Sequence, residues 1–345
     1  CYKKLSMSKK NSSVNLKKTF NDFEDLSNIF QNFRRKLDNL KKNRYLVAVS
    51  GGPDSLALVA LTKAYALLKK TKFYYILVDH KIRKNSYQEA NKVKKMLKKY
   101  QVNLIILTNK KKITKNIQAE ARDIRYGILF DYCKRKKITA LLTGHNLEDQ
   151  VETFFIRLSR GSGLKGLSAM KNPRKINNQL ILFRPLLDVK KKFLIKISKN
   201  IFGKYIKDPS NKNLIFLRTK IRNLKRPLEN SGIKYEQIYR SIQNLSISKS
   251  TLDEYLSKIF KEIIKKKKKE ISINYKKYTE LNNETKIALL NESIKRLQKN
   301  YYDLRSKKLV NLIKIINRKD FKKTTLGGCI FFKKGENLCL KDEKL

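Results

Sequence analysis

The first half of the chain alternates between uninterrupted apolar runs and segments in which apolar residues recur at helical spacing. The runs lie within residues 45–49, 72–79, 102–108 and 138–143, and the helical segments between them lie at about 56–68, 87–100 and 116–136. A run without polar residues is typical of a strand that is buried on both faces. Strands that alternate with helices indicate right-handed βαβ crossovers, so we expect an α/β fold built on a doubly wound parallel sheet.

The first apolar run is followed by a short turn that opens a helical segment. The turn consists of Ser50, Gly51, Gly52, Pro53, Asp54 and Ser55. Paired glycines let the main chain turn sharply and approach a ligand closely, and a proline suits the first position of a helix. Because the N–H groups at a helix start attract anions, the turn predicts a phosphate-binding site.

Asp54 distinguishes this turn from the lysine-bearing P-loop, because no Gly-Lys-Ser/Thr sequence closes it. A carboxylate in the first turn of a helix can simply complement the helix dipole. Beside a bound phosphate, however, it would repel unless a divalent cation lay between the two groups. The nucleotide interpretation therefore predicts Mg²⁺ bound by Asp54.

The chain contains two histidines, His80 and His145, and each follows an apolar run. In a doubly wound sheet the ligand lies beyond the carboxyl ends of the strands. We therefore expect both histidines, together with Gly144, at the edge that carries the phosphate-binding turn. A lone histidine is more often structural than catalytic, and this shared position is what favours a functional role.

Three acidic residues, Glu148, Asp149 and Glu152, open the helix that follows His145. They can serve the helix dipole alone. In a chain with 82 Lys+Arg against 29 Asp+Glu, acids above the crevice are better explained as ligands for a cation, either Mg²⁺ or an ammonium group. A lysine amine, with a free pKa of about 10.4, would have to lose a proton before attacking, and a carboxylate or His145 could accept it.

Composition limits the class of protein. With 345 residues and 41% hydrophobic content, the chain can form one large core and a smaller unit. The net charge of +53 favours a polyanionic partner such as nucleic acid, although an AT-rich genome, which encodes many lysines, would also raise it. Four cysteines without a CxxC pair argue against zinc and iron–sulfur sites. No apolar run approaches the length of a membrane span, so we expect a soluble, cytoplasmic protein, and the sequence leaves a homodimer open.

Two motifs carry a resemblance to a known family. SGGPDS, residues 50–55, resembles the SGGxDS motif of the PP-loop ATP pyrophosphatases, which split ATP into AMP and pyrophosphate. GHNLEDQVETFFIRLSRGSGLKGLSAM, residues 144–170, resembles the second motif of the tRNA(Ile)-lysidine synthetases within that superfamily. VDHKIR, AEARDIRY, RPLL and DPSNKNLIFLRTKIRNLKRPL follow the family's order, so the resemblance covers about residues 43–228.

This resemblance implies an enzyme that uses ATP to adenylate the wobble cytidine of a minor isoleucine tRNA with a CAU anticodon. The ε-amine of L-lysine then displaces AMP, and the product, lysidine, makes the anticodon read AUA instead of AUG. ATP with Mg²⁺, L-lysine and tRNA(Ile) are therefore the expected substrates and partners.

The same resemblance assigns roles to individual residues. Asp54 faces the metal and takes part in catalysis, Arg122 faces ATP or the cytidine, and Asp149 and Glu152 bind the substrate lysine and take part in catalysis. His145 is added as a catalytic candidate because of its position after an apolar run and because it is the only imidazole in this motif. ATP binding falls to Ser50, Gly51, Gly52, Pro53, Asp54 and Ser55, and we add His80 and Gly144 because they follow predicted strands at the same edge. The chain departs from the family pattern where Asn146 replaces a histidine and Glu148 replaces an aspartate.

Three segments are expected along the chain. Residues 1–18 are a basic tail that we expect to be disordered, and residues 19–228 form the ATP-binding catalytic domain, which begins with an amphipathic helix. Residues 229–345 are lysine-clad and mostly helical, with a terminal hairpin that turns at residues 335–337. Such a unit suits contact with tRNA phosphates, although any single lysine is more often simply solvated.

Three alternatives remain open. A tRNA-thiolating PP-loop enzyme would require a catalytic cysteine pair, and Cys133 has no obvious partner. An amidotransferase-linked synthetase of the same superfamily would require a glutaminase domain or partner, which the sequence does not show. A non-catalytic basic RNA-binding protein would keep its function after the substitution Asp54→Ala.

Overall fold

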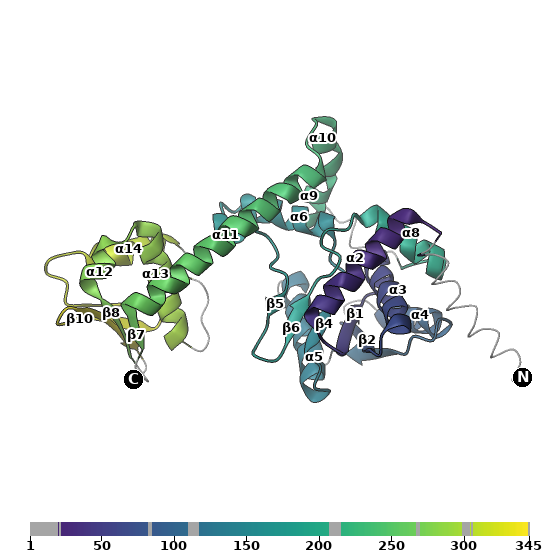
Figure 1. Ribbon diagram of the computed structural model, residues 1–345, viewed down its shortest axis with the longest axis horizontal. Helices are drawn as coiled ribbons and strands as arrows, with labels where there is room; N and C mark the ends of the chain where they lie inside the picture. Colours follow the sequence, from purple (N-terminus) through teal and green to yellow (C-terminus); the bar gives the residue numbers. More distant parts are fainter. Residues whose placement is uncertain are drawn as a thin grey trace, which may run out of the picture. The chain divides into compact units, whose positions relative to one another are not determined.

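The computed structural model describes residues 20, 22–81, 85–109, 117–206, 215–266, 270–298, 304 and 306–343. The tail expected at residues 1–18 lies outside this part of the chain. Contacts divide the chain into two compact units, Cys1–Ser246 and Ile247–Leu345. Figure 1 shows the chain coloured by residue number. Among the described residues, no helix has both the length and the apolar content that crossing a membrane requires.

A six-stranded sheet forms the centre of the first unit, with strand order β3-β2-β1-β4-β6-β5. Its strands are β1 (Arg44–Val49), β2 (Lys72–Asp79), β3 (Leu104–Thr108), β4 (Ala140–Leu142), β5 (Arg174–Lys175) and β6 (Ile181–Phe183). All neighbouring pairs are parallel except β5 and β6, so the predicted doubly wound parallel sheet is confirmed. The chain runs outward from β1 to β3 and returns to β4 beside β1, and sheets of this kind bind their ligands at such a reversal.

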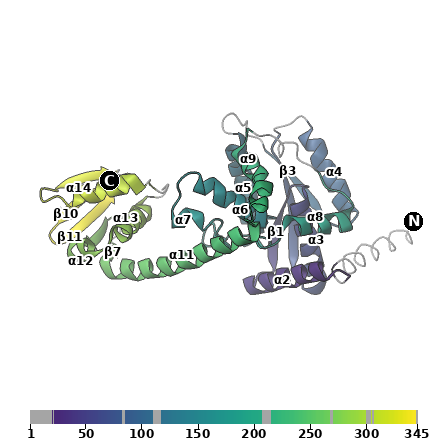
Figure 2. The ribbon, with the colours of Figure 1, turned by 90° about the horizontal axis from the view of Figure 1, so that it is seen from above.

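Helices cover both faces of this sheet, as Figures 1 and 2 show. Because successive side chains of a strand point to opposite faces, Tyr45 and Val47 of β1 join one core whereas Leu46 joins the other. The first core is covered by α2 (Glu24–Leu40), α3 (Pro53–Leu68), α4 (Ser86–Lys98) and α8 (Lys191–Phe202). The second core is covered by α5 (Ile117–Arg135). A strand with apolar neighbours on both sides needs an unbroken apolar run, which is the pattern that the sequence shows.

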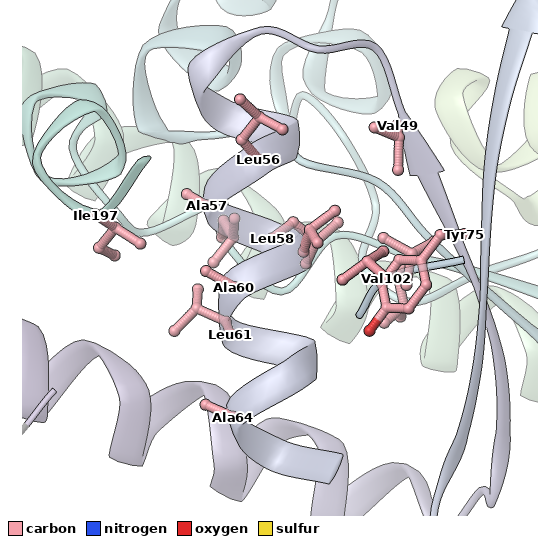
Figure 3. Close-up of a cluster of buried hydrophobic side chains, with 14 of the residues drawn as sticks. Val49, Leu56, Ala57, Leu58, Ala60, Leu61, Ala64, Tyr75, Val102 and Ile197 are labelled. Carbon is pink, nitrogen blue, oxygen red and sulfur yellow. The ribbon is translucent and has the colours of Figure 1, made fainter. Parts of the chain in front are cut away.

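Helix α3 lies inside the first core. Its residues 56–61 are fully buried, and Figure 3 shows α3 between Val49 and Tyr75 on one side and Ile197 of α8 on the other. The hydroxyl of the buried Thr62 donates to the carbonyl oxygen of Leu58 at 2.8 Å. A helix that is packed all round is fixed by its neighbours, so the turn at its start is held in a defined place.

Smaller helices stand next to the carboxyl edge of the sheet. They are α6 (Leu147–Leu158), α7 (Leu164–Leu167), α9 (Leu217–Asn223), α10 (Lys225–Asn230) and the first turns of α11 (Tyr235–Ile263). Helix α6 packs against α9 and, through a small core that includes Val151, Tyr235 and Ile242, against the start of α11. This packing fixes the helix that carries the predicted acids.

The second unit contains a five-stranded antiparallel sheet with strand order β7-β8-β11-β10-β9. Its strands are β7 (Ile264–Lys266), β8 (Glu270–Asn274), β9 (Lys323–Leu326), β10 (Cys329–Lys334) and β11 (Asn337–Asp342). Its helices are α12 (Tyr275–Glu280), α13 (Asn283–Leu297) and α14 (Ser306–Ile316). Ile271, Leu289, Ile313 and Phe331 belong to the core that joins the helices to the sheet.

The terminal hairpin of this unit is confirmed, because β10 pairs with β11 and Lys334 lies opposite Asn337 across the turn. The helices expected at about residues 285–299 and 306–318 are α13 and α14. Strands β7, β8 and β9 were not predicted. Lys265, expected in a solvated charge run, is an exposed residue of β7, and residues 267–269 of that run lie outside the described residues.

Candidate active site

The turn after β1 has the shape expected of a phosphate-binding loop. Gly51 has a φ of +82°, and a Cβ built on it would lie 2.6 Å from Cγ2 of Val93, so the position requires glycine. Gly52 precedes α3 in an extended conformation, and Pro53 is the first helical residue. The chain therefore turns directly into the start of α3, where the first N–H groups of a helix can bind an anion.

Two serines hold this turn in place. The hydroxyl of Ser55 donates to the carbonyl oxygen of Gly52 at 3.0 Å and accepts from the amide of Ser50 at 3.1 Å. The hydroxyl of Ser50 lies 3.2 Å from the same oxygen of Ser55. The carbonyl oxygen of Gly51 accepts from the amide of Ile206 at 2.9 Å. The turn is thus preorganised by its own side chains and by a distant segment.

The end of β4 lies directly against this turn. A Cβ added to Gly144 would lie 2.8 Å from the carbonyl oxygen of Asp54 and 3.1 Å from the amide nitrogen of Ser55. Side-chain carbons do not approach backbone atoms so closely, so this contact requires glycine at position 144. Gly144 therefore brings the start of α3 and the start of α6 to the same crevice.

Asp54 lies in this crevice, and its surroundings disfavour its charge. Burial raises the pKa of Asp54 to about 6, with the charge of Lys191 opposing the rise and the charge of Asp149 adding to it. Its Oδ1 atom is buried and has no hydrogen-bond partner among the described residues. A buried carboxylate oxygen of this kind fits a divalent cation or another positively charged ligand.

The described residues contain no group of three or more His, Cys, Asp and Glu side chains that could hold a metal ion by itself. Mg²⁺ is commonly bound by one or two carboxylates together with substrate phosphates and water. The single carboxylate of Asp54 beside a phosphate-binding turn fits that pattern.

Asn146 and Asp149 cap α6 reciprocally. The amide of Asp149 donates to Oδ1 of Asn146 at 3.0 Å, and the amide of Asn146 donates to Oδ2 of Asp149 at 3.0 Å. Asn146, which stands where the resembling family has a histidine, is therefore a buried helix cap. The cap also fixes the carboxylate of Asp149 at the start of α6.

Two arginines of α9 hold the predicted acids. Arg218 donates through Nη2 to Oδ1 of Asp149 at 2.9 Å and through Nε to Oε2 of Glu152 at 2.6 Å. Arg222 donates through Nε to Oε1 of Glu152 at 2.7 Å. Sequence reasoning missed both arginines as site residues. Their spacing of four, which sets two cations on one face of a short helix, was the available signal.

Glu148 has a different set of partners. Its carboxylate accepts from the amide of Lys191 at 2.9 Å and from Nζ of Lys225 at 3.2 Å. Together with Glu152 and Arg222 it lines a cavity of about 410 Å³ beside α6. The longer side chain at this position therefore ties α6 to the start of α8.

His145 is held in its neutral form. Burial, followed by the positive charges of Arg184 and Arg122, holds the pKa of His145 well below its usual range. Its Nδ1 atom lies 2.9 Å from the hydroxyl oxygen of Thr143. The lowered pKa makes His145 a weaker base than a free imidazole, so it does not favour His145 over a carboxylate as the acceptor of the lysine proton.

His80 and Arg122 lie at the same edge of the sheet among other partners. Nδ1 of His80 is buried without a hydrogen-bond partner in the described part of the chain, and burial followed by the charge of Arg125 lowers the pKa of His80. Arg122 and Arg125 lie over the ring of Tyr126, with Cζ to ring-centre distances of 5.2 Å and 5.5 Å. Arg125 was not predicted as a site residue, although its spacing of three from Arg122 places both on one face of α5.

A phosphate-binding turn at the start of α3, a buried carboxylate beside it and acids on a neighbouring helix define an ATP-using enzyme of the PP-loop class. Residues 25–228 match the family model of the PP-loop domain. The U34-tRNA thiolase NcsA from Methanococcus maripaludis shares the fold, with a TM-score of 0.55 and 21% sequence identity over 64% of this chain and 79% of that chain.

Two relatives named tRNA(Ile)-lysidine synthase match the chain over different lengths. The protein of Wolbachia pipientis wMel is 33% identical over 303 residues, which are 86% of this chain and 70% of that protein. The protein of Orientia tsutsugamushi (strain Boryong) is 40% identical over 202 residues, which are 57% of this chain and 45% of that protein. The chain belongs to the tRNA(Ile)-lysidine synthase family of PP-loop ATP-using enzymes.

Proposed function

We propose that the protein adenylates the wobble cytidine of a minor isoleucine tRNA with a CAU anticodon and then joins L-lysine to it. The observation that carries the proposal is the contact between Gly144 and the backbone of Asp54, because it sets the phosphate-binding turn of α3 beside the acids of α6. A triphosphate and an amine can therefore reach one nucleotide in the same crevice. The overall reaction forms a carbon–nitrogen bond and converts ATP into AMP and pyrophosphate.

In the first step, the O2 oxygen of cytidine attacks the α-phosphorus of ATP, and pyrophosphate leaves. Residues 50–55 bind the departing phosphates through main-chain N–H groups, and His80 and Gly144 contribute to the ATP site from the neighbouring strand ends. Arg122 faces the reacting phosphate or the cytidine. A carbonyl oxygen is a poor leaving group, and adenylation turns it into AMP, which leaves readily.

Mg²⁺ fits this step, and Asp54 is the residue that would hold it. Its buried Oδ1 lacks a hydrogen-bond partner among the described residues, and its pKa is raised to about 6. When bound, the ion supplies charge neutralisation for the phosphates and for the departing pyrophosphate. A bare carboxylate at this position would instead repel the phosphates.

In the second step, the ε-amine of lysine attacks C2 of the cytidine, and AMP leaves with the former O2 oxygen. Asp149 and Glu152 bind the ε-ammonium group beforehand. Both carboxylates already accept from arginine, but an ionised carboxylate has about four acceptor positions and can take a further donor. A carboxylate or His145 accepts the proton that the amine must lose.

The tRNA backbone is expected to contact the second unit as well as the crevice. Lys308 and Lys314 are exposed residues of α14, and Lys333 is a partly exposed residue of β10. Lysines bind phosphates without reading the sequence, so this unit contributes affinity for tRNA in general. Residues of the crevice then select the anticodon of tRNA(Ile). The proposed reaction takes place in the cytoplasm, where tRNA is used.

Thiolation of tRNA, the alternative reaction for a PP-loop enzyme, has less support. Cys133 is a fully buried residue of α5, and burial raises the pKa of its thiol to about 12. A thiol that stays protonated is a poor nucleophile. Cys329 and Cys339 are buried in the second unit. The described cysteines therefore offer no exposed pair for sulfur transfer.

Purified protein incubated with ATP, radiolabelled lysine and a minor tRNA(Ile) transcript tests the proposal. Label should remain in the tRNA only when ATP is present and only when the wobble base is cytosine, with one AMP released for each lysine joined. Equal labelling of a transcript with a uracil wobble base contradicts the proposal, and incorporation of sulfur supports the alternative. Asp54→Ala separates catalysis from binding, because a protein that merely binds RNA would keep its function.

A further inference from the structure

Arg184 is a buried cation that none of the steps above uses. It follows β6 directly, at the same edge of the sheet as the phosphate-binding turn and His145, and it is 3% exposed. Its Nη1 atom donates to the carbonyl oxygen of Lys171 at 3.0 Å, whereas its Nε atom is buried without a hydrogen-bond partner among the described residues. A guanidinium group withdrawn from water is costly unless an anion compensates it.

Two more guanidinium groups, those of Arg122 and Arg125, act on the same histidine as Arg184. Arg122 and Arg125 share the ring of Tyr126, and the charges of Arg122, Arg125 and Arg184 all act on His145. Burial lowers the pKa of Arg184, Tyr126 opposes this shift, and the charge of Arg122 adds to it. Three guanidinium groups that act on one histidine at this edge of the sheet would suit a strongly charged anion.

The acids of the crevice do not neutralise this cluster. Asp149 and Glu152 form ion pairs with Arg218 and Arg222 of α9. Within the described residues, no ion pair joins Arg184 to a carboxylate. The anion that suits Arg184 must therefore come from a ligand.

We propose that Arg184, together with Arg122 and Arg125, forms a second phosphate-binding site, and that its ligand is a backbone phosphate of the RNA beside the modified nucleotide. A planar guanidinium presents two parallel donors that match the oxygens of a phosphate. The inference rests on the proposed function in one respect, which is that the bound polymer is RNA.

The position of Arg184 in the sheet favours RNA over ATP as the source of the phosphate. Strand β4 separates β6 from β1, so the ends of β1 and β6 lie about 10 Å apart at the usual strand spacing. His80, which is assigned to ATP, follows β2 on the opposite side of β1. Arg184 thus lies one strand beyond Gly144 and three strands from His80, at the margin of the expected ATP site.

A row of exposed cations continues outward from Arg184. Lys171, Arg174 and Lys175 are exposed, and Lys175 lies opposite Ile181 where β5 pairs with β6. The side chain of Asn172 ties this segment to Arg184, because it accepts from the amide of Arg184 at 2.8 Å and donates to its carbonyl oxygen at 3.0 Å. Exposed cations that lead to a buried one suit a chain of phosphates better than a single phosphate group.

Two binding measurements on the full chain show whether the phosphate comes from RNA or from ATP. One uses a labelled CAU anticodon stem–loop, and the other uses a non-hydrolysable ATP analogue. Arg184→Gln should weaken RNA binding about 10-fold and lower the slope of log K against log salt by about one, while leaving the ATP analogue within about 2-fold. Arg135→Gln is the matched control, because it removes the same charge from an exposed position at the other end of α5.

Two other results would change the assignment. Weaker binding of the ATP analogue with unchanged RNA binding keeps the phosphate site and overturns RNA as its source. If Arg184→Gln matches Arg135→Gln for both ligands, Arg184 binds no phosphate and the proposal is wrong.

A second measurement does not depend on the folding of Arg184→Gln. Stem–loops that carry one uncharged methylphosphonate on either side of the wobble nucleotide are bound to the original protein and to Arg184→Lys, which keeps the charge. At one modified position, the original protein should bind the stem–loop about 10-fold more weakly. On that stem–loop the original protein and Arg184→Lys should have equal affinity. If no position does so, the proposal is wrong. Lysine incorporation by the original protein is measured in parallel, so a failure of the proposed function is seen separately from a failure of this site.

Discussion

Arg218 donates through Nε to the buried carboxylate of Glu152 at 2.6 Å, although 66 residues separate the two along the chain. Arg222 contacts the same carboxylate from the next turn of α9. The acid proposed to bind the substrate amine is therefore already fixed in place before lysine arrives. A preorganised charge of this kind needs no rearrangement when the cationic substrate binds.

Glu152→Gln should impair the lysine step selectively. The substitution keeps the size of the side chain but removes the charge that holds the ammonium group, so the KM for lysine should rise at least about 10-fold. Transfer of AMP to the tRNA without lysine should change less than about 3-fold. Because Arg218 and Arg222 are 34% and 31% exposed and can be resolvated, the free energy of unfolding should fall by only about 1 to 3 kcal/mol.

Glu229→Gln is the control for that experiment. Glu229 has a 41% exposed side chain, and its carboxylate lies 4.0 Å from Nζ of Lys225 in a pair one helical turn apart. Exposed pairs of this type contribute roughly 0 to 1 kcal/mol, so the control should be close to the original protein in stability and in KM. A lysine KM that Glu152→Gln leaves unchanged would remove Glu152 from the amine site.

Gly144→Ala should move the start of α3 away from the start of α6. The added methyl group would lie 2.8 Å from the carbonyl oxygen of Asp54, so the backbone of β4 or of the turn must move. We expect a loss of about 1 to 3 kcal/mol in stability and a rise of about 10-fold or more in the KM for ATP.

Gly127→Ala is the matched control for Gly144→Ala. Gly127 lies within α5, and no described atom outside the local helix backbone lies within 4 Å of a Cβ built there. Alanine in a helix interior should stabilise the protein by up to about 1 kcal/mol and leave the KM for ATP unchanged. Equal ATP kinetics for both variants would show that the contact at position 144 does not shape the ATP site.

Asp54→Asn should remove a pH-dependent contribution to the stability of the protein without ligands. Burial raises the pKa of Asp54 from 3.8 to about 6, so between these values the folded protein holds more protons on this group than the unfolded chain does. The contribution of Asp54 to the free energy of unfolding therefore falls as the pH rises from about 4 to about 6. Urea unfolding should find the Asn variant equal to the original protein near pH 4 and up to about 3 kcal/mol more stable at pH 7, although inactive.

Asp131→Asn, on an exposed position of α5, is the control and should show no such trend. If Asp54→Asn gives the same stability difference at both pH values, the carboxylate of Asp54 is not destabilised by burial. The case for a cation beside it would then lose its physical basis.

The double substitution Lys308→Gln and Lys314→Gln should weaken tRNA binding through charge alone. Each lysine that contacts a phosphate contributes about 0.7 to 0.9 to the slope of log K against log salt, so the slope should fall by about 1.4 to 1.8. The same change at Lys94 and Lys98 of α4 is the control, and neither pair should alter the KM for ATP. An unchanged slope would exclude α14 from the tRNA-binding surface.

Local patterns predicted the centre of the fold well. The four apolar runs became β1 to β4 because each strand is covered on both faces and so tolerates no polar side chain in its middle. The turn at residues 50–55 was recognisable because its glycine, proline and serine positions each serve a local need at the start of α3. Requirements of this kind depend on consecutive residues, so a short motif is enough to predict them.

Contacts between residues far apart along the chain were harder to predict from the sequence. The link from Arg218 to Glu152 joins α9 to α6 across 66 residues, and nothing in either helix alone specifies it. The role of Arg184 depends on its burial after the three-residue strand β6, which is too short for a clear period. In the second unit, the alternation of Ile271 and Ile273 in β8 was obscured by the lysine run before it.

A single-turnover experiment with ATP labelled at its α-phosphate asks whether one crevice performs both steps. Without lysine, label should pass from ATP to the wobble nucleotide of the CAU transcript, and a chase of unlabelled lysine should release it as AMP as the lysine is joined. Lysine incorporation without any preceding transfer of label to the tRNA would mean that the cytidine is not the group activated. Label that stays on the tRNA after the lysine chase would mean that the acids of α6 do not bring the amine to the adenylated base.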